Sequence, residues 1–117
     1  DVNIFSFSEE EMSKFLDDYP ELSQGTIPAS AYTSLEEDVP AISLWNFAIT
    51  HKDMSESFVY EVTKTVMESQ ERMLQVHGSA RETIPENAEH NSFIPWHPGA
   101  VRWFEENGYE IPEDLRG

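Results

Sequence analysis

An almost unbroken apolar run from Ala41 to Ile49 is the strongest indication of architecture in this chain. The run is rich in Ile, Trp and Phe, and a continuous run of such residues is typical of a β-strand covered on both faces. An acidic turn at residues 36–38 and Pro40 precede it, so the strand is expected to begin directly after a loop. About nine residues is long for a strand in a small domain, and this length suits a strand that crosses between two lobes.

Two long helices are predicted from capping residues and apolar spacing. Ser8 opens the first helix, and Glu11 three positions later completes a capping box. The second helix covers about residues 55–77, with Asp53 as its predicted cap and Gly78 as its predicted end. Apolar residues at helical spacing form the inner faces: Met12, Phe15, Leu16 and Tyr19 in the first helix, and Phe58, Val59, Val62, Val66, Met73 and Leu74 in the second.

Two shorter helices follow. Pro85 falls in the first turn of a helix that is expected over residues 83–89, and Pro98 begins a last helix that ends at Gly108. The remaining expectations are a strand at residues 2–7, a brief strand at residues 26–27 and an extended, loosely held tail at residues 109–117. This is an α/β pattern with too few strands for a complete doubly wound sheet, so the chain is expected to be a fragment or to need a partner.

Composition narrows the classes of partner. The chain holds 7 basic and 23 acidic residues, a formal net charge of −16, which repels nucleic acid and anionic lipid. We interpret the acidity as a solvated face, with an acidic patch for a cationic partner or metal as the alternative. The absence of cysteine excludes disulfides, thiolate zinc sites and cysteine nucleophiles. The chain contains no apolar run of about 18 residues, the length of a membrane-spanning helix.

Neither metal binding nor catalysis has a motif here, and we expect no cofactor, no metal site and no catalytic residue. The histidines do not have helical metal-ligand spacing; they are His51, His77, His90 and His97. His97 is instead expected to cap or orient the last helix. Carboxylate pairs arise by chance at this acidic density, and no serine-nucleophile, P-loop or dinucleotide motif occurs. The chain is therefore expected not to be an enzyme.

Three residues are candidates for ligand contact. Trp45 and Asn46 lie side by side in the apolar run, where an aromatic side chain usually belongs to the core. A buried Asn46 would need a hydrogen-bond partner, which a ligand or a hinge backbone could provide. Tyr32 lies in the loop before the run and is an equally plausible wall of a pocket.

Short motifs follow one another along almost the whole chain. The pattern IPaxxY is matched by Ile27, Pro28, Ala29 and Tyr32. The triplet DVP before the strand is matched by Asp38, Val39 and Pro40, and an LVT at its end is matched loosely by Ala48, Ile49 and Thr50. The helix pattern lvYeitKal is matched by Phe58, Val59, Tyr60, Glu61, Val62, Thr63 and Lys64.

The closing pattern PlHPGAxryyxexG is matched by Pro95, His97, Pro98, Gly99, Ala100, Arg102, Trp103, Phe104, Glu105 and Gly108. In this order and spacing the motifs resemble the C-terminal part of the TAXI-type solute receptors of TRAP transporters. The resemblance implies a type II periplasmic binding protein-like fold, in which two α/β lobes are joined by crossing strands and hold a ligand in the cleft.

The expected fold class is therefore α/β, as a C-terminal fragment of that two-lobe fold. Residues 1–40 would form the end of the second lobe with a strand, a helix and a loop. Residues 41–50 would be the interlobe crossing strand, and residues 51–117 would be C-terminal helices packing on the first lobe. Most of one lobe would be missing, so a fragment of this kind is expected to bind ligand poorly by itself.

The function that the resemblance implies is solute capture outside the cytoplasm, in the periplasm or its equivalent. The implied ligand is a small organic anion, an amino acid or a carboxylate, with Tyr32, Trp45 and Asn46 near the cleft. The implied partners are the membrane subunits of a TRAP transporter, with uptake driven by an ion gradient. Neither nucleic acid binding nor direct membrane insertion is expected.

Two other classes stay open from the residues alone. A stand-alone acidic interaction domain would bind a basic partner, and its affinity would fall steeply with salt. A small hydrolase or lyase with a scattered carboxylate site has no motif behind it. A self-sufficient domain should unfold cooperatively, whereas a receptor fragment should be marginally stable or should dimerise through exposed core surface.

Overall fold

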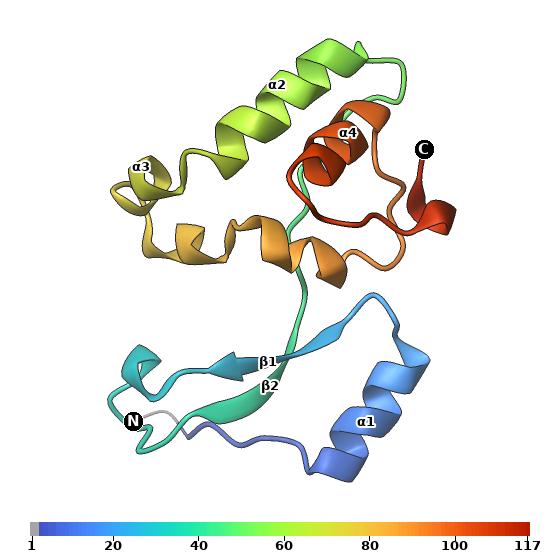
Figure 1. Ribbon diagram of the computed structural model, residues 1–117. Helices are drawn as coiled ribbons and strands as arrows, with labels where there is room; N and C mark the ends of the chain where they lie inside the picture. Colours follow the sequence, from blue (N-terminus) through green and yellow to red (C-terminus); the bar gives the residue numbers. More distant parts are fainter. Residues whose placement is uncertain (1–2) are drawn as a thin grey trace. The chain divides into compact units, whose positions relative to one another are not determined.

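The computed structural model describes residues 3–117 (Figure 1). The chain divides into two units, Asp1–Phe47 and Ala48–Gly117. The division falls inside the apolar run, between Phe47 and Ala48.

The first unit contains one helix and a two-stranded antiparallel ribbon (Figure 1). Its elements are α1 (Glu9–Asp18), β1 (Ser23–Ile27), a 3-10 turn (Ala29–Ala31) and β2 (Val39–Ser43). The pairing runs from Ser23 opposite Ser43 to Ile27 opposite Val39. The capping box that begins α1 is confirmed, because Ser8 Oγ accepts the Glu11 N–H and the Glu11 carboxylate accepts the Ser8 N–H at 3.0 Å.

The apolar run forms a shorter strand than the sequence predicts. β2 ends at Ser43, and residues 44–50 have no regular secondary structure. Continued pairing would place Leu44 opposite Leu22, but Leu22 closes the turn after α1, where its N–H donates to the Tyr19 carbonyl at 3.0 Å. The run is also not covered on both faces, since Leu44 is 62% exposed and Ile49 is 81% exposed.

The strand predicted at residues 2–7 is wrong for residues 3–7, which have no regular structure, and Val2 lies outside the described residues. Strand pairing needs complementary main-chain groups, and Pro40 of the neighbouring β2 has no N–H to offer. The Ser6 hydroxyl donates instead to the Pro40 carbonyl. β1 is longer than the brief strand expected at residues 26–27.

The second unit consists of helices and turns around a small aromatic core. Its elements are α2 (Glu56–Met67), α3 (Gln70–Leu74), two 3-10 turns (Gly78–Glu82 and Pro85–His90), α4 (Pro98–Glu106) and a last 3-10 turn (Glu113–Leu115). Among the residues described, the core cluster comprises Val101, Trp103, Phe104 and Ile111, with Tyr60, Met67, Ala88, Trp96 and Tyr109 packed against it. α2 packs against α4 (Figure 1).

The helix predicted over residues 55–77 is divided into α2 and α3. Ser69 leaves the helical conformation between them, in keeping with the low helix propensity of serine. Ser55 rather than Asp53 caps α2, through a hydrogen bond from the Phe58 N–H. Gly78 does not end a helix in the left-handed conformation; it begins a 3-10 turn capped by His77.

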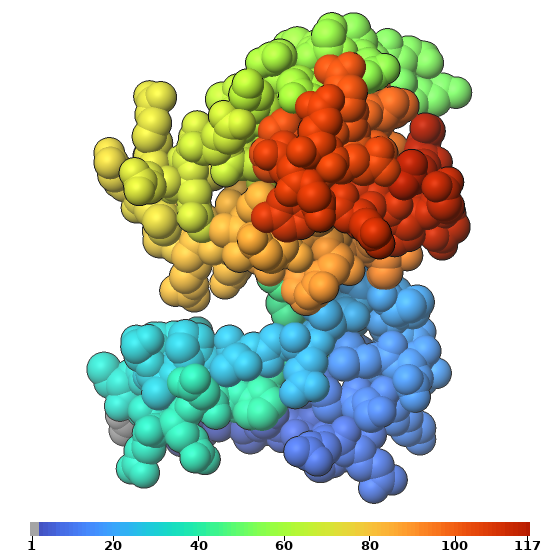
Figure 2. Space-filling model, in the orientation of Figure 1, coloured from blue at the N-terminus to red at the C-terminus, as the bar shows by residue number. Residues whose placement is uncertain are grey.

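The tail is anchored, in contrast to the loose tail that the sequence predicts. Ile111 and Leu115 are buried. The Trp96 N–H donates to the Leu115 carbonyl at 2.7 Å, and the Gly117 N–H donates to the Trp96 carbonyl at 2.9 Å. In Figure 2 the tail, in red, adjoins α4, in orange-red. These contacts make residues 109–117 part of the second unit.

The capping box makes a testable prediction about Glu11. Hydrogen bonds from the backbone and then the hydroxyl of Ser8 lower the pKa of the Glu11 carboxyl. We expect Ser8→Ala to raise that pKa part of the way back, because the backbone donor remains. A lowered folded-state pKa means that the stabilisation exists above the ordinary pKa and is lost as pH falls through the folded value. An NMR pH titration of Glu11 in both proteins measures this; identical midpoints would contradict it.

Candidate functional site

The structure places the three predicted ligand residues in and just after the two-stranded ribbon. Tyr32 ends the 3-10 turn that follows β1, beyond the Ile27 end of the ribbon. Trp45 and Asn46 follow β2 beyond Ser43, at the opposite end. Five paired residues at about 3.3 Å each separate the two ends. The ribbon therefore keeps Trp45 and Asn46 together and Tyr32 apart from them.

Trp45 is partly buried, and its indole N–H donates to Ser23 Oγ at 2.8 Å. This bond fixes the ring beside the first residue of β1. Asn46 is exposed, so its side-chain amide can hydrogen-bond to water. It therefore does not need the protein or ligand partner that a buried asparagine would need.

The loop that carries Tyr32 is closed by a side-chain contact. Asp38 Oδ1 accepts the Ala29 N–H at 2.8 Å. This bond joins the IPaxxY segment to the DVP segment, nine residues apart in the chain. The same loop is held near Tyr32 by the Leu35 N–H, which donates to the Tyr32 carbonyl at 3.1 Å. Both motifs therefore shape the loop at the Ile27 end of the ribbon.

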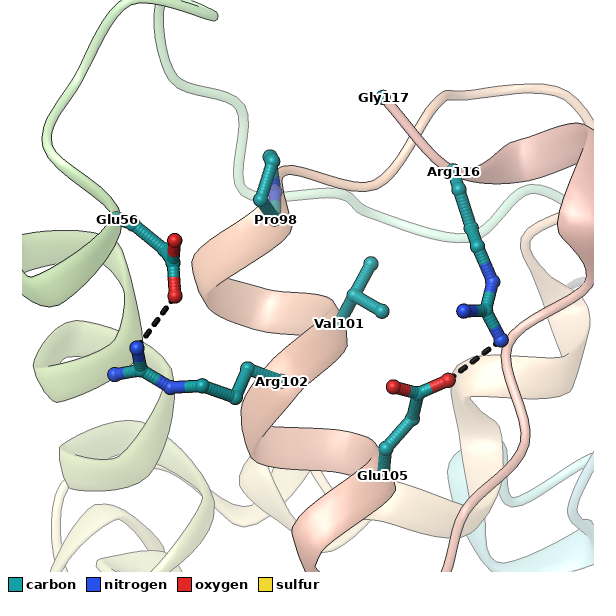
Figure 3. Close-up of a pocket in the computed structure, with 7 residues that line it drawn as sticks. All are labelled: Glu56, Pro98, Val101, Arg102, Glu105, Arg116 and Gly117. Carbon is teal, nitrogen blue, oxygen red and sulfur yellow. Dashed lines mark hydrogen bonds and ion pairs between the residues drawn. The ribbon is translucent and has the colours of Figure 1, made fainter.

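An open depression of about 270 Å³ lies in the second unit, and sequence reasoning did not find it (Figure 3). Its lining comes from α2, α4 and the tail: Glu56, Pro98, Val101, Arg102, Glu105, Arg116 and Gly117. Two of the seven basic residues of the chain line it. A pair of arginines beside a depression is an arrangement that can bind a carboxylate ligand, provided that the guanidinium groups are available.

Arg102 is already occupied by groups of the protein. Its guanidinium bonds the Glu56 carboxylate, lies 3.8 Å from Glu106 Oε1 and stacks 4.2 Å from the centre of the Tyr60 ring. The Tyr60 hydroxyl donates to Glu106 Oε2 at 2.7 Å, and this hydrogen bond raises the pKa of Tyr60. The four side chains join α2 to α4.

Arg116 is occupied in the same way. It contacts Glu105 Oε1 at 2.5 Å and donates to the Ile111 carbonyl at 3.1 Å. Figure 3 shows each arginine aimed at a glutamate of the protein. An anion would have to displace these carboxylates, so the depression is best explained as a structural joint of the second unit.

The HPGA segment also has a structural role, as the sequence predicts for His97. His97 Nδ1 accepts the Gly99 N–H at 3.1 Å, and Nε2 lies 3.1 Å from the Met54 carbonyl. With Nδ1 as acceptor, the ring proton is on Nε2 and donates to Met54. His97 thus caps α4 and ties it to Met54, two residues before α2, while Pro98 occupies the first helical position.

Within residues 3–117 no group of three or more His, Cys, Asp or Glu side chains is arranged to hold a metal ion. No helix in that range has the length and apolar character needed to cross a membrane.

A small mixture of helices with a two-stranded sheet is compatible with a fragment of an α/β protein. Residues 1–108 match the NMT1-like family, and the chain belongs to this family. The family is periplasmic binding protein-like and is related to the TAXI and NMT1 binding proteins. Membership suggests a periplasmic solute-binding protein, a class that is generally not enzymatic.

Proposed function

We propose that this chain is part of a TAXI-type solute receptor of a TRAP transporter. The receptor captures a small organic anion, an amino acid or a carboxylate, in a cleft between two lobes. The match of residues 1–108 to a periplasmic binding protein-like family carries the proposal. The ordered motifs from IPaxxY to HPGA support the TAXI subtype.

The organisation of the chain supports the hinge in this proposal. The two units divide between Phe47 and Ala48, inside the segment 41–50 that is proposed as the interlobe crossing. Residues 44–50 are not part of the two-stranded sheet. Strand pairing therefore does not restrict their backbone dihedral angles, as a hinge requires. In the proposed receptor, residues 1–40 complete the second lobe and residues 51–117 pack on the first.

Ligand contact in the proposed cleft is assigned to Tyr32, Trp45 and Asn46. The exposed Asn46 amide offers both donors and an acceptor to an anion or an amino acid. The Trp45 ring is oriented by its bond to Ser23 and can provide an apolar wall. Because Tyr32 lies at the other end of the ribbon, it would contact a different part of the ligand or of the cleft rim.

The proposed mechanism is population shift. Ligand stabilises the closed cleft, and the closed form docks on the membrane subunits of the transporter. Uptake then draws on an ion gradient rather than on ATP hydrolysis. Solute capture and the energy source of uptake are separate parts of this mechanism, and both can be tested in cells.

Deletion of the encoding gene should abolish uptake of at least one labelled amino acid or dicarboxylate from a panel. A plasmid copy should restore that uptake. The restored uptake should collapse with an ionophore that dissipates the ion gradient, and it should persist when ATP is depleted while the gradient is maintained. Unchanged uptake across the panel, or uptake that follows ATP alone, would contradict the proposal.

The complemented strain also tests the assigned ligand residues. Trp45→Ala should raise the half-saturating solute concentration roughly tenfold, because a buried aromatic anchor typically contributes that much to binding. Leu44→Ala is the matched control, since Leu44 is the neighbouring residue and is mostly exposed. Equal half-saturation in the two strains would remove Trp45 from the binding site.

A further inference from the structure

The C-terminus of α4 is closed by a Schellman motif, in which two N–H groups beyond the helix bond to carbonyls of its last turn. The Gly108 N–H donates to the Glu105 carbonyl at 3.0 Å, and the Tyr109 N–H donates to the Phe104 carbonyl at 2.9 Å. Gly108 has a φ of 85°, and no other residue in the described range 3–117 has a positive φ. The glycine therefore makes this end of the helix possible.

The same motif holds one ring of the aromatic core in place. The Tyr109 ring lies edge-on to the Phe104 ring, with 6.0 Å between their centroids. An apolar contact between these two positions commonly accompanies a Schellman motif. Here the contact involves Phe104, which is 1% exposed. Opening of the motif would therefore release Tyr109 from the core of the second unit.

The residue before the glycine is an asparagine, and Asn107–Gly108 is the only Asn–Gly pair in the sequence. Such a pair is prone to deamidation because glycine has no side chain to hinder attack on the asparagine amide. The Gly108 nitrogen attacks Cγ of Asn107, the Cγ–Nδ2 bond breaks, and ammonia leaves with the proton of the Gly108 N–H. Water then opens the resulting succinimide at either carbonyl and gives aspartate or isoaspartate.

We propose that Asn107 is a self-modification site, and that isoaspartate at this position opens the C-terminus of α4. Isoaspartate routes the main chain through Cβ and Cγ, so the chain between residues 107 and 108 becomes one atom longer. Both bonds of the motif have their donor after this point and their acceptor before it. The added atom therefore displaces both donors. All groups involved belong to residues 103–109, and the proposal does not depend on the transport function.

The folded structure slows this reaction. The Gly108 N–H is engaged by the Glu105 carbonyl, and Asn107 Nδ2 donates to the Trp103 carbonyl at 2.8 Å. Ring closure also requires Cβ of Asn107 and the Gly108 nitrogen to be eclipsed about the Cα–C bond, and the Asn107 ψ of 10° keeps them far from that arrangement. The reaction must therefore start from molecules in which the end of α4 has opened locally.

Aspartate, the other product, should disturb the motif less than isoaspartate, because it leaves the length of the main chain unchanged. Its negative charge would lie at the C-terminus of α4, where the helix dipole is unfavourable for an anion. The bond from Nδ2 to the Trp103 carbonyl would also be lost. Asn107→Asp reproduces this product and separates the effect of charge from that of chain length.

Peptide mapping by mass spectrometry measures the reaction in the protein expressed from its natural gene and aged in mildly alkaline buffer. In denaturing urea, Asn107 should deamidate faster than Asn46, which is followed by the bulky Phe47. In the folded protein, deamidation of Asn107 should be at least about tenfold slower than in urea, because local opening must come first. The inference would be overturned by an Asn107 rate in urea no higher than that of Asn46, or by equal Asn107 rates in the two conditions.

Amide hydrogen exchange tests the structural consequence. Deamidated protein, separated by ion exchange, should lose most of the protection of the Tyr109 amide. Asn107→Asp should lower that protection only about two- to fivefold, the usual effect of an unfavourable charge at a helix end. Asn107→Ser is the matched control because it cannot form the succinimide, and ageing should leave its Tyr109 protection unchanged. Deamidated protein with no less protection than Asn107→Asp would overturn the inference.

Discussion

Replacement of Phe104 by alanine should destabilise the second unit by about 3–5 kcal/mol, the usual cost of removing a large buried aromatic side chain. Phe104 is 1% exposed. Three aromatic rings surround it edge-on: Trp96 at 5.0 Å, Trp103 at 5.1 Å and Tyr109 at 6.0 Å between centroids. Edge-on contacts between aromatic rings stabilise a core beyond the burial of apolar surface. The alanine variant would lose both the burial of the Phe104 ring and these ring contacts.

The loss is a large share of the stability of a small domain, which is typically about 5–15 kcal/mol. Urea denaturation followed by near-UV circular dichroism measures it, because Trp96 and Trp103 both contact Phe104. Phe58→Ala is the matched control: its side chain is 53% exposed, and its loss should change stability by no more than about 0.5 kcal/mol. Similar denaturation midpoints for the two variants would show that the aromatic cluster is not the core.

The helix boundaries that could be predicted from the sequence are those set by contacts between residues a few positions apart in the chain. The Ser8 capping box and the start of α4 at Pro98 involve residues two or three positions apart. Their chemistry can be read from the sequence because a helix cap is a local contact. Val101 and Phe104 lie three positions apart in α4 and are both in the core, as helical spacing places them on one face.

Contacts between distant segments could not be predicted in this way. β2 ends at Ser43, opposite the first residue of β1, and nothing in the apolar run itself indicates where its partner strand begins. The tail is held through Trp96, about twenty residues earlier in the chain. A loose tail and an anchored tail have the same local sequence, so only the long-range contact distinguishes them.

The candidate site shows the same limit. Trp45 and Asn46 are neighbours in sequence and stay together, whereas Tyr32 is carried to the other end of the ribbon by the antiparallel register. The depression with its two arginines was missed because Arg116 meets Glu105 only after the tail folds back on α4. The ion pair between Arg102 and Glu106, at helical spacing, was the one signal available in the sequence.

Replacement of Gly99 by alanine should destabilise the second unit by about 3 kcal/mol, the upper end of the usual cost of overpacking. A Cβ atom at Gly99 would lie 2.2 Å from the Glu56 carbonyl oxygen and 2.8 Å from the Tyr60 nitrogen. Both atoms belong to the α2 backbone and cannot rotate away, so α2 and α4 would have to separate. That movement would also stretch the bond from His97 to Met54.

Gly78→Ala is the matched control, because no atom lies within 4 Å of its Cβ position and its φ is not positive. It should leave stability unchanged or raise it by up to about 1 kcal/mol. Urea denaturation of both variants gives the comparison. Alanine is the better helix former by about 1 kcal/mol, so local propensity alone would make Gly99→Ala more stable. A loss in Gly99→Ala therefore reports the close approach of the two helices, whereas a gain would show that α2 and α4 do not pack backbone to backbone at this residue.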